Sequence, residues 1–118
     1  MTGTTNFSDI LAPLEQAAPG LLSAPAPQYL QEPRGYFAGR AIALARPRTT
    51  EETALCIRPA VTGNIAVIPY AGGTGLVGGQ VRPDDSPAMI LSLERMARIR
   101  ELSDADQTMV AEAGAILA

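Results

Sequence analysis

Apolar residues near the N-terminus recur at helical spacing. The residues that share one helical face are Phe7, Ile10, Leu11 and Leu14. That spacing predicts a helix, and Pro19-Gly20 should end it. Pro13 should either kink this helix or form its first residue. The prolines between residues 22 and 34 predict an extended, irregular approach to the next element.

From residue 41 onward, short apolar runs flank one helical pattern. Residues 41–45 (AIALA) predict a short buried strand. Thr49 and Glu52 form a capping box: the Thr49 hydroxyl accepts from the Glu52 amide, and the Glu52 side chain reaches back. Residues 65–69 predict a second strand that is buried on both faces, because no polar residue interrupts them. Strand, helix and strand form a βαβ unit, so we expect parallel strands and a right-handed crossover.

Three further features complete the predicted elements. Pro59 should kink the helix or end it early, and Gly63-Asn64 is its stop signal. Residues 89–93 (MILSL) predict a third strand, and residues 109–112 a fourth. Residues 115–118 resemble the opening turn of a helix.

Composition excludes several classes of function. The chain has 118 residues, and its 47% hydrophobic content places it among globular proteins. Its net charge of −3 argues against a nucleic-acid partner, which would need a basic surface. Cys56 is the sole cysteine and there is no histidine, so we predict no catalytic constellation, no metal site and no internal disulfide.

Nothing in the sequence predicts a membrane span or a secretory signal. No apolar run is long enough to cross a bilayer, and the first ten residues lack a basic region followed by an apolar one. We therefore expect a cytoplasmic protein.

A glycine cluster follows the second predicted strand. Residues 73–78 spell G-x-G-x-x-G, the fingerprint of Rossmann domains. A Rossmann turn must open a helix, but Gly78, Gly79 and Pro83 do not allow a long helix here. The Lys-Ser/Thr pair of a P-loop is also absent. Both motifs are therefore rejected.

The glycine cluster has two remaining interpretations. It could be a turn that only connects strands. However, five glycines within eight residues imply several positions that need positive φ or close backbone approach. Successive backbone N–H groups in such a loop form an anion-binding concavity. The loop has no charged side chain, so this pattern favours a pyrophosphate held by main-chain donors, with the Thr74 hydroxyl assisting.

Several segments, taken in order, carry a more specific signature. They are YLQEPRG (29–35), ALARP (43–47), TTEE (49–52), IPYAGGTGLVGG (68–79), ILSLERM (90–96) and VAEAG (110–114). Together they resemble the FAD-linked oxidases that share the fold of vanillyl-alcohol oxidase and para-cresol methylhydroxylase (PCMH). Within that family the chain is most similar to the D-2-hydroxyglutarate and D-lactate dehydrogenase (glycolate oxidase) branch.

The resemblance implies an α+β fold. It would be the first α/β subdomain of a PCMH-type FAD-binding domain, with a βαβ unit and a small, mostly parallel sheet. Residues 1–37 would form a helical and extended lead-in, and residues 38–118 an incomplete first lobe. FAD would be bound non-covalently, because the chain has no histidine to attach it.

The resemblance also assigns cofactor contacts. The implied residues are Pro69, Tyr70, Ala71, Gly72, Gly73, Thr74, Gly75, Leu76, Gly78, Gly79, Ala113 and Gly114. Close relatives often have Gln and Gly where Tyr70 and Ala71 stand. Because alanine rarely adopts positive φ, Ala71 in place of glycine could demand negative φ at this position. We expect Arg95, Arg98 and Arg100 to be a solvated strand end and turn.

The implied function is that of a flavin-dependent oxidoreductase. The complete protein would oxidise a small 2-hydroxy acid by hydride transfer to FAD. The chain lacks a substrate domain, so we expect it to be truncated, inactive alone, and left with an uncovered apolar face and strand edge. The alternative is a free-standing module that binds a nucleotide, a phosphate or a partner protein without catalysis.

Overall fold

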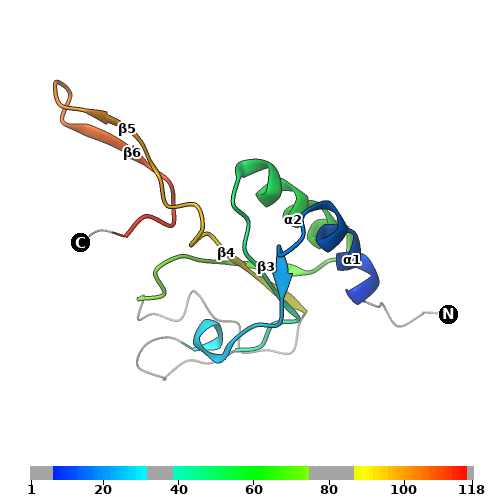
Figure 1. The fold of residues 1–118 in the computed structure, drawn as a ribbon. Coiled ribbons are helices and arrows are strands. Elements are labelled where there is room, and N and C mark those ends of the chain that lie inside the picture. The colour runs from blue at the N-terminus through cyan, green and yellow to red at the C-terminus, as the bar shows by residue number, and fades with distance from the viewer. Residues whose placement is uncertain (1–6, 32–38, 75–86, 117–118) are drawn as a thin grey trace.

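The computed structural model describes residues 7–31, 39–74 and 87–116. Two helices, a short 3-10 helix and two sheets make up this mixed α+β structure (Figure 1). The helices are α1 (Phe7–Ala17), α2 (Thr50–Thr62) and the 3-10 helix η1 (Pro27–Leu30). The strands are β1 (Leu22–Ser23), β2 (Ala43–Ala45), β3 (Ala66–Tyr70), β4 (Ala88–Ser92), β5 (Ile99–Ser103) and β6 (Thr108–Ala111).

The larger sheet has the strand order β1-β2-β4-β3. Both β2 and β3 pair with β4 in parallel, so the predicted parallel arrangement of the βαβ strands is confirmed. The two strands are not neighbours, because β4 lies between them. The right-handed crossover stays a prediction.

The prediction that the second strand is buried on both faces was wrong. β3 lies at the edge of the sheet, and only Ile68 in it is buried. β4 is the strand whose five residues are all buried. A continuous apolar run does not distinguish an edge strand from a central one, since that depends on the order in which strands pair.

The two faces of the larger sheet are covered differently. Helices α1 and α2 pack on one face and form the main core, which includes Leu11, Cys56 and Met89 (Figure 1). On the other face, Tyr29 of η1 packs with Leu44 and Ile90. This second cluster holds the 3-10 helix against the middle of β2 and β4.

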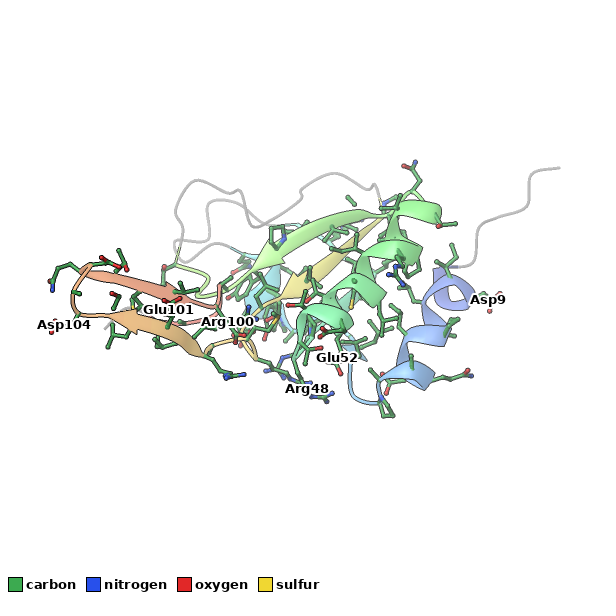
Figure 2. The ribbon with its side chains drawn as sticks, turned by 90° about the horizontal axis from the view of Figure 1, so that it is seen from above. Asp9, Arg48, Glu52, Arg100, Glu101 and Asp104 are labelled. Atoms are coloured by element: carbon green, nitrogen blue, oxygen red, sulfur yellow. The ribbon has the colours of Figure 1, made fainter. Side chains whose placement is uncertain are left out.

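Helix α2 begins as its sequence predicts. The Thr49 hydroxyl accepts from the Glu52 amide at 3.1 Å. The Glu52 carboxylate reaches back one residue further than expected, to the Arg48 amide at 2.8 Å, and the two side chains also form an ion pair at 3.4 Å (Figure 2). Acidic groups in this first turn also complement the helix dipole.

The two helical prolines end neither helix. α2 continues beyond Pro59 to Thr62, so of the two expected outcomes the early end was wrong, and the kink stays a prediction. Pro59 lies in the last turn, where it removes one hydrogen bond while its own carbonyl accepts from Gly63. Asn64 (φ 55°) then ends the helix as predicted. α1 likewise runs through Pro13 and does not begin there.

Strands β5 and β6 form an antiparallel hairpin that projects away from the sheet (Figure 1). The sequence predicted β6 but missed β5. Apolar side chains on this hairpin are exposed, and they include Ile99, Leu102, Met109 and Val110. Figure 2 shows Asp104 at its tip, at the opposite end of the molecule from Asp9 on α1.

Candidate functional site

The glycine loop begins at the carboxyl end of β3. The parallel strands β2, β4 and β3 end at the same edge of the sheet, where ligands bind in open α/β sheets. The Leu93 amide donates to the Tyr70 carbonyl at 2.7 Å, which joins the end of β4 to the start of the loop. The predicted contacts that lie here are Pro69, Tyr70, Ala71, Gly72, Gly73 and Thr74. Four others lie outside the described residues: Gly75, Leu76, Gly78 and Gly79.

The described part of the loop fits an anionic group. Gly73 has φ +71°, a conformation that other residues rarely adopt, and a Cβ there would overlap the Tyr70 hydroxyl. Nothing lies within 4 Å of the position that a Cβ would take on Gly72, so the backbone is open on that side. Ala71 is not among the described residues with positive φ. Residues 71–74 have no charged side chain that would repel a phosphate.

A hydrogen-bonded cluster lies beside this loop. Oε1 of Glu94 accepts from the Tyr29 hydroxyl at 2.7 Å and from the Ser92 hydroxyl at 2.6 Å. The rings of Tyr29 and Tyr70 pack edge to face, with centroids 4.7 Å apart. The cluster therefore joins η1, the end of β4 and the last residue of β3, after which the glycine loop begins.

The environment of the two tyrosines raises their pKa values. Burial is the larger cause for the Tyr29 pKa, followed by its hydrogen bond to Glu94 and the charge of that carboxylate. Burial also raises the pKa of Tyr70, and the negative charge of Glu94 adds to it. Both phenols therefore keep their protons at neutral pH.

The second predicted segment, Ala113 and Gly114, lies against the turn that follows β4. Gly114 is buried, and its amide donates to the Met96 carbonyl at 2.9 Å. A Cβ on Gly114 would overlap the Leu93 carbonyl oxygen. This glycine therefore has a packing role, whereas Ala113 is exposed. In space, residues 93–96 lie between the start of the glycine loop and Gly114.

Arg95 differs from the expected solvated residue. It is partly buried, and its Nη1 donates to the carbonyls of Arg46 at 3.2 Å and Gly20 at 3.4 Å. Burial, and then repulsion from the nearby arginines, lowers the pKa of Arg95. Arg98 and Arg100 are exposed, as expected.

Sequence reasoning missed the partners of this cluster, Tyr29, Ser92 and Glu94. Tyr29 lies in the proline-rich stretch, 65 residues before Glu94. A possible signal was the polar Ser-x-Glu pair directly after an apolar strand, since strand ends at this edge commonly carry functional groups.

Other chemistry has little support in the described part of the chain. Residues 7–31, 39–74 and 87–116 contain no group of three His, Cys, Asp or Glu side chains that could hold a metal. Burial raises the pKa of the Cys56 thiol to about 11, so this cysteine is unreactive at neutral pH. No helix among the described residues is long and apolar enough to span a bilayer.

Comparisons with known proteins agree on one family. The model of the "FAD binding domain" family matches residues 41–118. Mitochondrial D-2-hydroxyglutarate dehydrogenase from Bos taurus is 35% identical over 113 residues, which cover 92% of this chain and 20% of that protein. D-2-hydroxyglutarate dehydrogenase from Xanthomonas citri pv. viticola is 36% identical over 73 residues, or 62% of this chain and 15% of that protein. The chain thus spans about a fifth or less of these relatives.

Solved structures show the same fold. Alkyldihydroxyacetonephosphate synthase superimposes with a TM-score of 0.76 at 15% identity, over 98% of this chain and 25% of that one. 4-Ethylphenol oxidase from Gulosibacter chungangensis gives a TM-score of 0.70 at 19% identity, over 92% of this chain and 22% of that one. The small, mostly parallel sheet expected from the resemblance is therefore confirmed.

Proposed function

The chain belongs to the FAD-binding domain family, and from this premise we propose that it forms the N-terminal FAD-binding part of a flavin-dependent oxidoreductase. The whole protein would oxidise a small 2-hydroxy acid. The relatives named D-2-hydroxyglutarate dehydrogenase support this substrate class. On this proposal the chain alone is inactive, because the groups that bind the hydroxy acid lie elsewhere in the whole protein.

One observation carries the proposal. A glycine with positive φ, next to a glycine with an open backbone, lies at the carboxyl end of β3. Backbone N–H groups in such a turn can bind a pyrophosphate without any cationic side chain. FAD, when bound, accepts the hydride, and this chain holds and orients it.

The predicted contacts are retained as the proposed binding residues. In the described part of the loop, the main chain of residues 69–74 would face the diphosphate. Gly75, Leu76, Gly78 and Gly79 would continue that contact, and Ala113 and Gly114 would lie near the cofactor. Binding would be non-covalent, since the chain has no histidine.

The division of the chain is also a proposal. Residues 1–37 would serve as a lead-in that covers the first lobe, residues 38–118. Leu11 and Leu14 of α1 pack in the same core as Met89 of β4, which supports this role.

The cattle relative is named as a mitochondrial enzyme, so fractionation of source cells would test the predicted cytoplasmic location.

Titration of the chain with FAD, followed by flavin fluorescence, tests the proposal. We expect binding, and at least a tenfold loss of affinity in Gly73→Ala, because the methyl group would strain the loop and displace Tyr70. Gly20→Ala is the matched control: Gly20 also has positive φ (+84°), but it lies at the end of α1.

A second variant separates ligand contact from backbone strain. Gly72→Ala places a methyl group on the open side of the loop, where the proposal places the diphosphate. It should therefore weaken FAD binding, with no change in the urea midpoint of unfolding. The proposal fails if the wild-type chain binds no FAD, or if Gly73→Ala and Gly20→Ala lower the affinity equally.

A further inference from the structure

We propose that the Tyr70 hydroxyl donates a hydrogen bond to the nucleoside diphosphate at the glycine loop, and that Tyr29 is the positioning residue for the Tyr70 ring. This inference rests on the proposed function of the loop. It assigns a side-chain donor to a site that otherwise depends on main-chain groups.

The position of the hydroxyl supports this role. A Cβ built on Gly73 would meet the Tyr70 hydroxyl oxygen first and then Cζ and Cε2 of the ring. The phenol therefore lies against the backbone of the loop at its one described position with positive φ. A side chain other than glycine at position 73 would remove the hydroxyl from this place.

The two neighbouring tyrosines differ in how their hydroxyls are satisfied. Tyr29 donates to Glu94 at 2.7 Å, so its proton is already committed. For the Tyr70 hydroxyl, no hydrogen-bond partner lies within residues 7–31, 39–74 and 87–116. A partly buried phenol normally has an acceptor, and a phosphate oxygen at this loop would supply one.

The orientation of Tyr70 depends on its neighbours. Its ring packs edge to face on Tyr29, with an interplanar angle of 61°. Tyr29 is in turn fixed by Glu94, whose Oε1 also accepts from Ser92. Burial and the charge of Glu94 raise the pKa of Tyr70, so the hydroxyl remains a donor. The two hydroxyls bound to Oε1 also offset part of the carboxylate charge near a phosphate.

Two phenylalanine variants test the proposal, because one should change mainly FAD affinity and the other mainly the stability of the fold. FAD affinity and the urea midpoint are measured for the wild-type chain, Tyr70→Phe and Tyr29→Phe. We expect Tyr70→Phe to weaken FAD binding about tenfold, the typical effect of losing a hydrogen bond to a charged group, with an unchanged urea midpoint. Tyr29→Phe should lower the urea midpoint and weaken FAD binding by a smaller factor.

The outcomes separate this inference from the proposed function. If the wild-type chain binds FAD and Tyr70→Phe binds it equally well, the inference is wrong and the proposed function stands. A drop in the urea midpoint of Tyr70→Phe as large as that of Tyr29→Phe would also overturn it, because the hydroxyl would then have a role in folding. Absence of FAD binding by the wild-type chain overturns both.

Discussion

Strands β4 and β5 belong to the same short chain, yet their surroundings are opposite. All five residues of β4 are buried, between the helices on one face and η1 on the other. Four of the five residues of β5 are exposed, and all four of β6 are. β4 pairs with β2 and β3, and β5 pairs with β6, but hydrogen bonds between strands do not cover the two faces of a sheet. The difference is that the larger sheet has covering layers and the hairpin has none.

This comparison locates the stability of the chain. Burial of apolar surface is the main favourable term in folding, and the buried apolar residues lie in the larger sheet, in the helices that cover it and in the segments next to them. The hairpin instead presents apolar side chains around an open hollow, which is lined by residues that include Leu102, Thr108 and Met109. An isolated two-stranded hairpin is marginally stable. We therefore expect mutations of the two regions to have very different effects.

The largest expected effect comes from a pair of identical substitutions. Met89→Ala in β4 should lower the free energy of unfolding by about 2–5 kcal/mol, because it opens a cavity at a fully buried position. Met109→Ala in β6 should change it by less than about 0.5 kcal/mol, since that side chain is 53% exposed. Urea unfolding followed by circular dichroism measures both, and equal effects would contradict the comparison.

The junction between the two regions gives the next largest effect. Gly114→Ala would force a methyl group against the Leu93 carbonyl, at an expected cost of about 1–3 kcal/mol. Ala113→Ser, at the less buried neighbouring position, is the control. Amide exchange should quicken in β5 and β6 of Gly114→Ala. Wild-type exchange there would show that the hairpin does not depend on this contact.

The cap of α2 should have a smaller effect. Thr49→Ala removes the acceptor of the Glu52 amide and should cost about 1 kcal/mol of unfolding free energy. Thr50→Ala changes the adjacent exposed threonine, which is the first residue of the helix, and should cost less. If the two variants have the same urea midpoint, the cap does not stabilise the covered region.

The smallest effect concerns the hairpin and depends on pH. The Glu112 carboxylate accepts from the Arg98 amide and from the Arg100 side chain, and these bonds lower its pKa from the usual value of 4.5. A lowered pKa in the folded state stabilises the fold above pH 4.5, and this contribution is lost as the pH falls through the lower value. NMR titration of the Arg98 amide should therefore show a transition below pH 4.5, and Glu112→Gln should abolish it.

Local patterns predicted the local structure well. The apolar spacing before Pro19, the capping box at Thr49 and the run at residues 89–93 each depend on residues close in sequence. β5 was missed because Ile99–Ser103 has two adjacent charged residues, Arg100 and Glu101, and so lacks the strict alternation of apolar and polar residues that indicates a strand. The Ser- and Asp-rich residues 103–106 (SDAD) are typical of a turn and could have indicated a hairpin.

Long-range features could not be predicted in the same way. Nothing near residue 88 indicates that β4 is inserted between β2 and β3, so the burial of β3 was overestimated. For the site, the glycine loop was recognised from the sequence, because clustered glycines indicate a backbone that needs positive φ or close approach. The bond between Tyr29 and Glu94 joins residues 65 positions apart, and only the fold brings them together.

The central position of β4 also affects how the chain can fold during its synthesis. β2 and β3 are not paired with each other, and both pair with a strand that a ribosome makes later than either. In a nascent chain that ends before residue 88, the helices can form, but β3 has no partner and β2 has only the two-residue β1. Such an intermediate exposes apolar strand edges, and this is the stage at which a chaperone would protect it from aggregation.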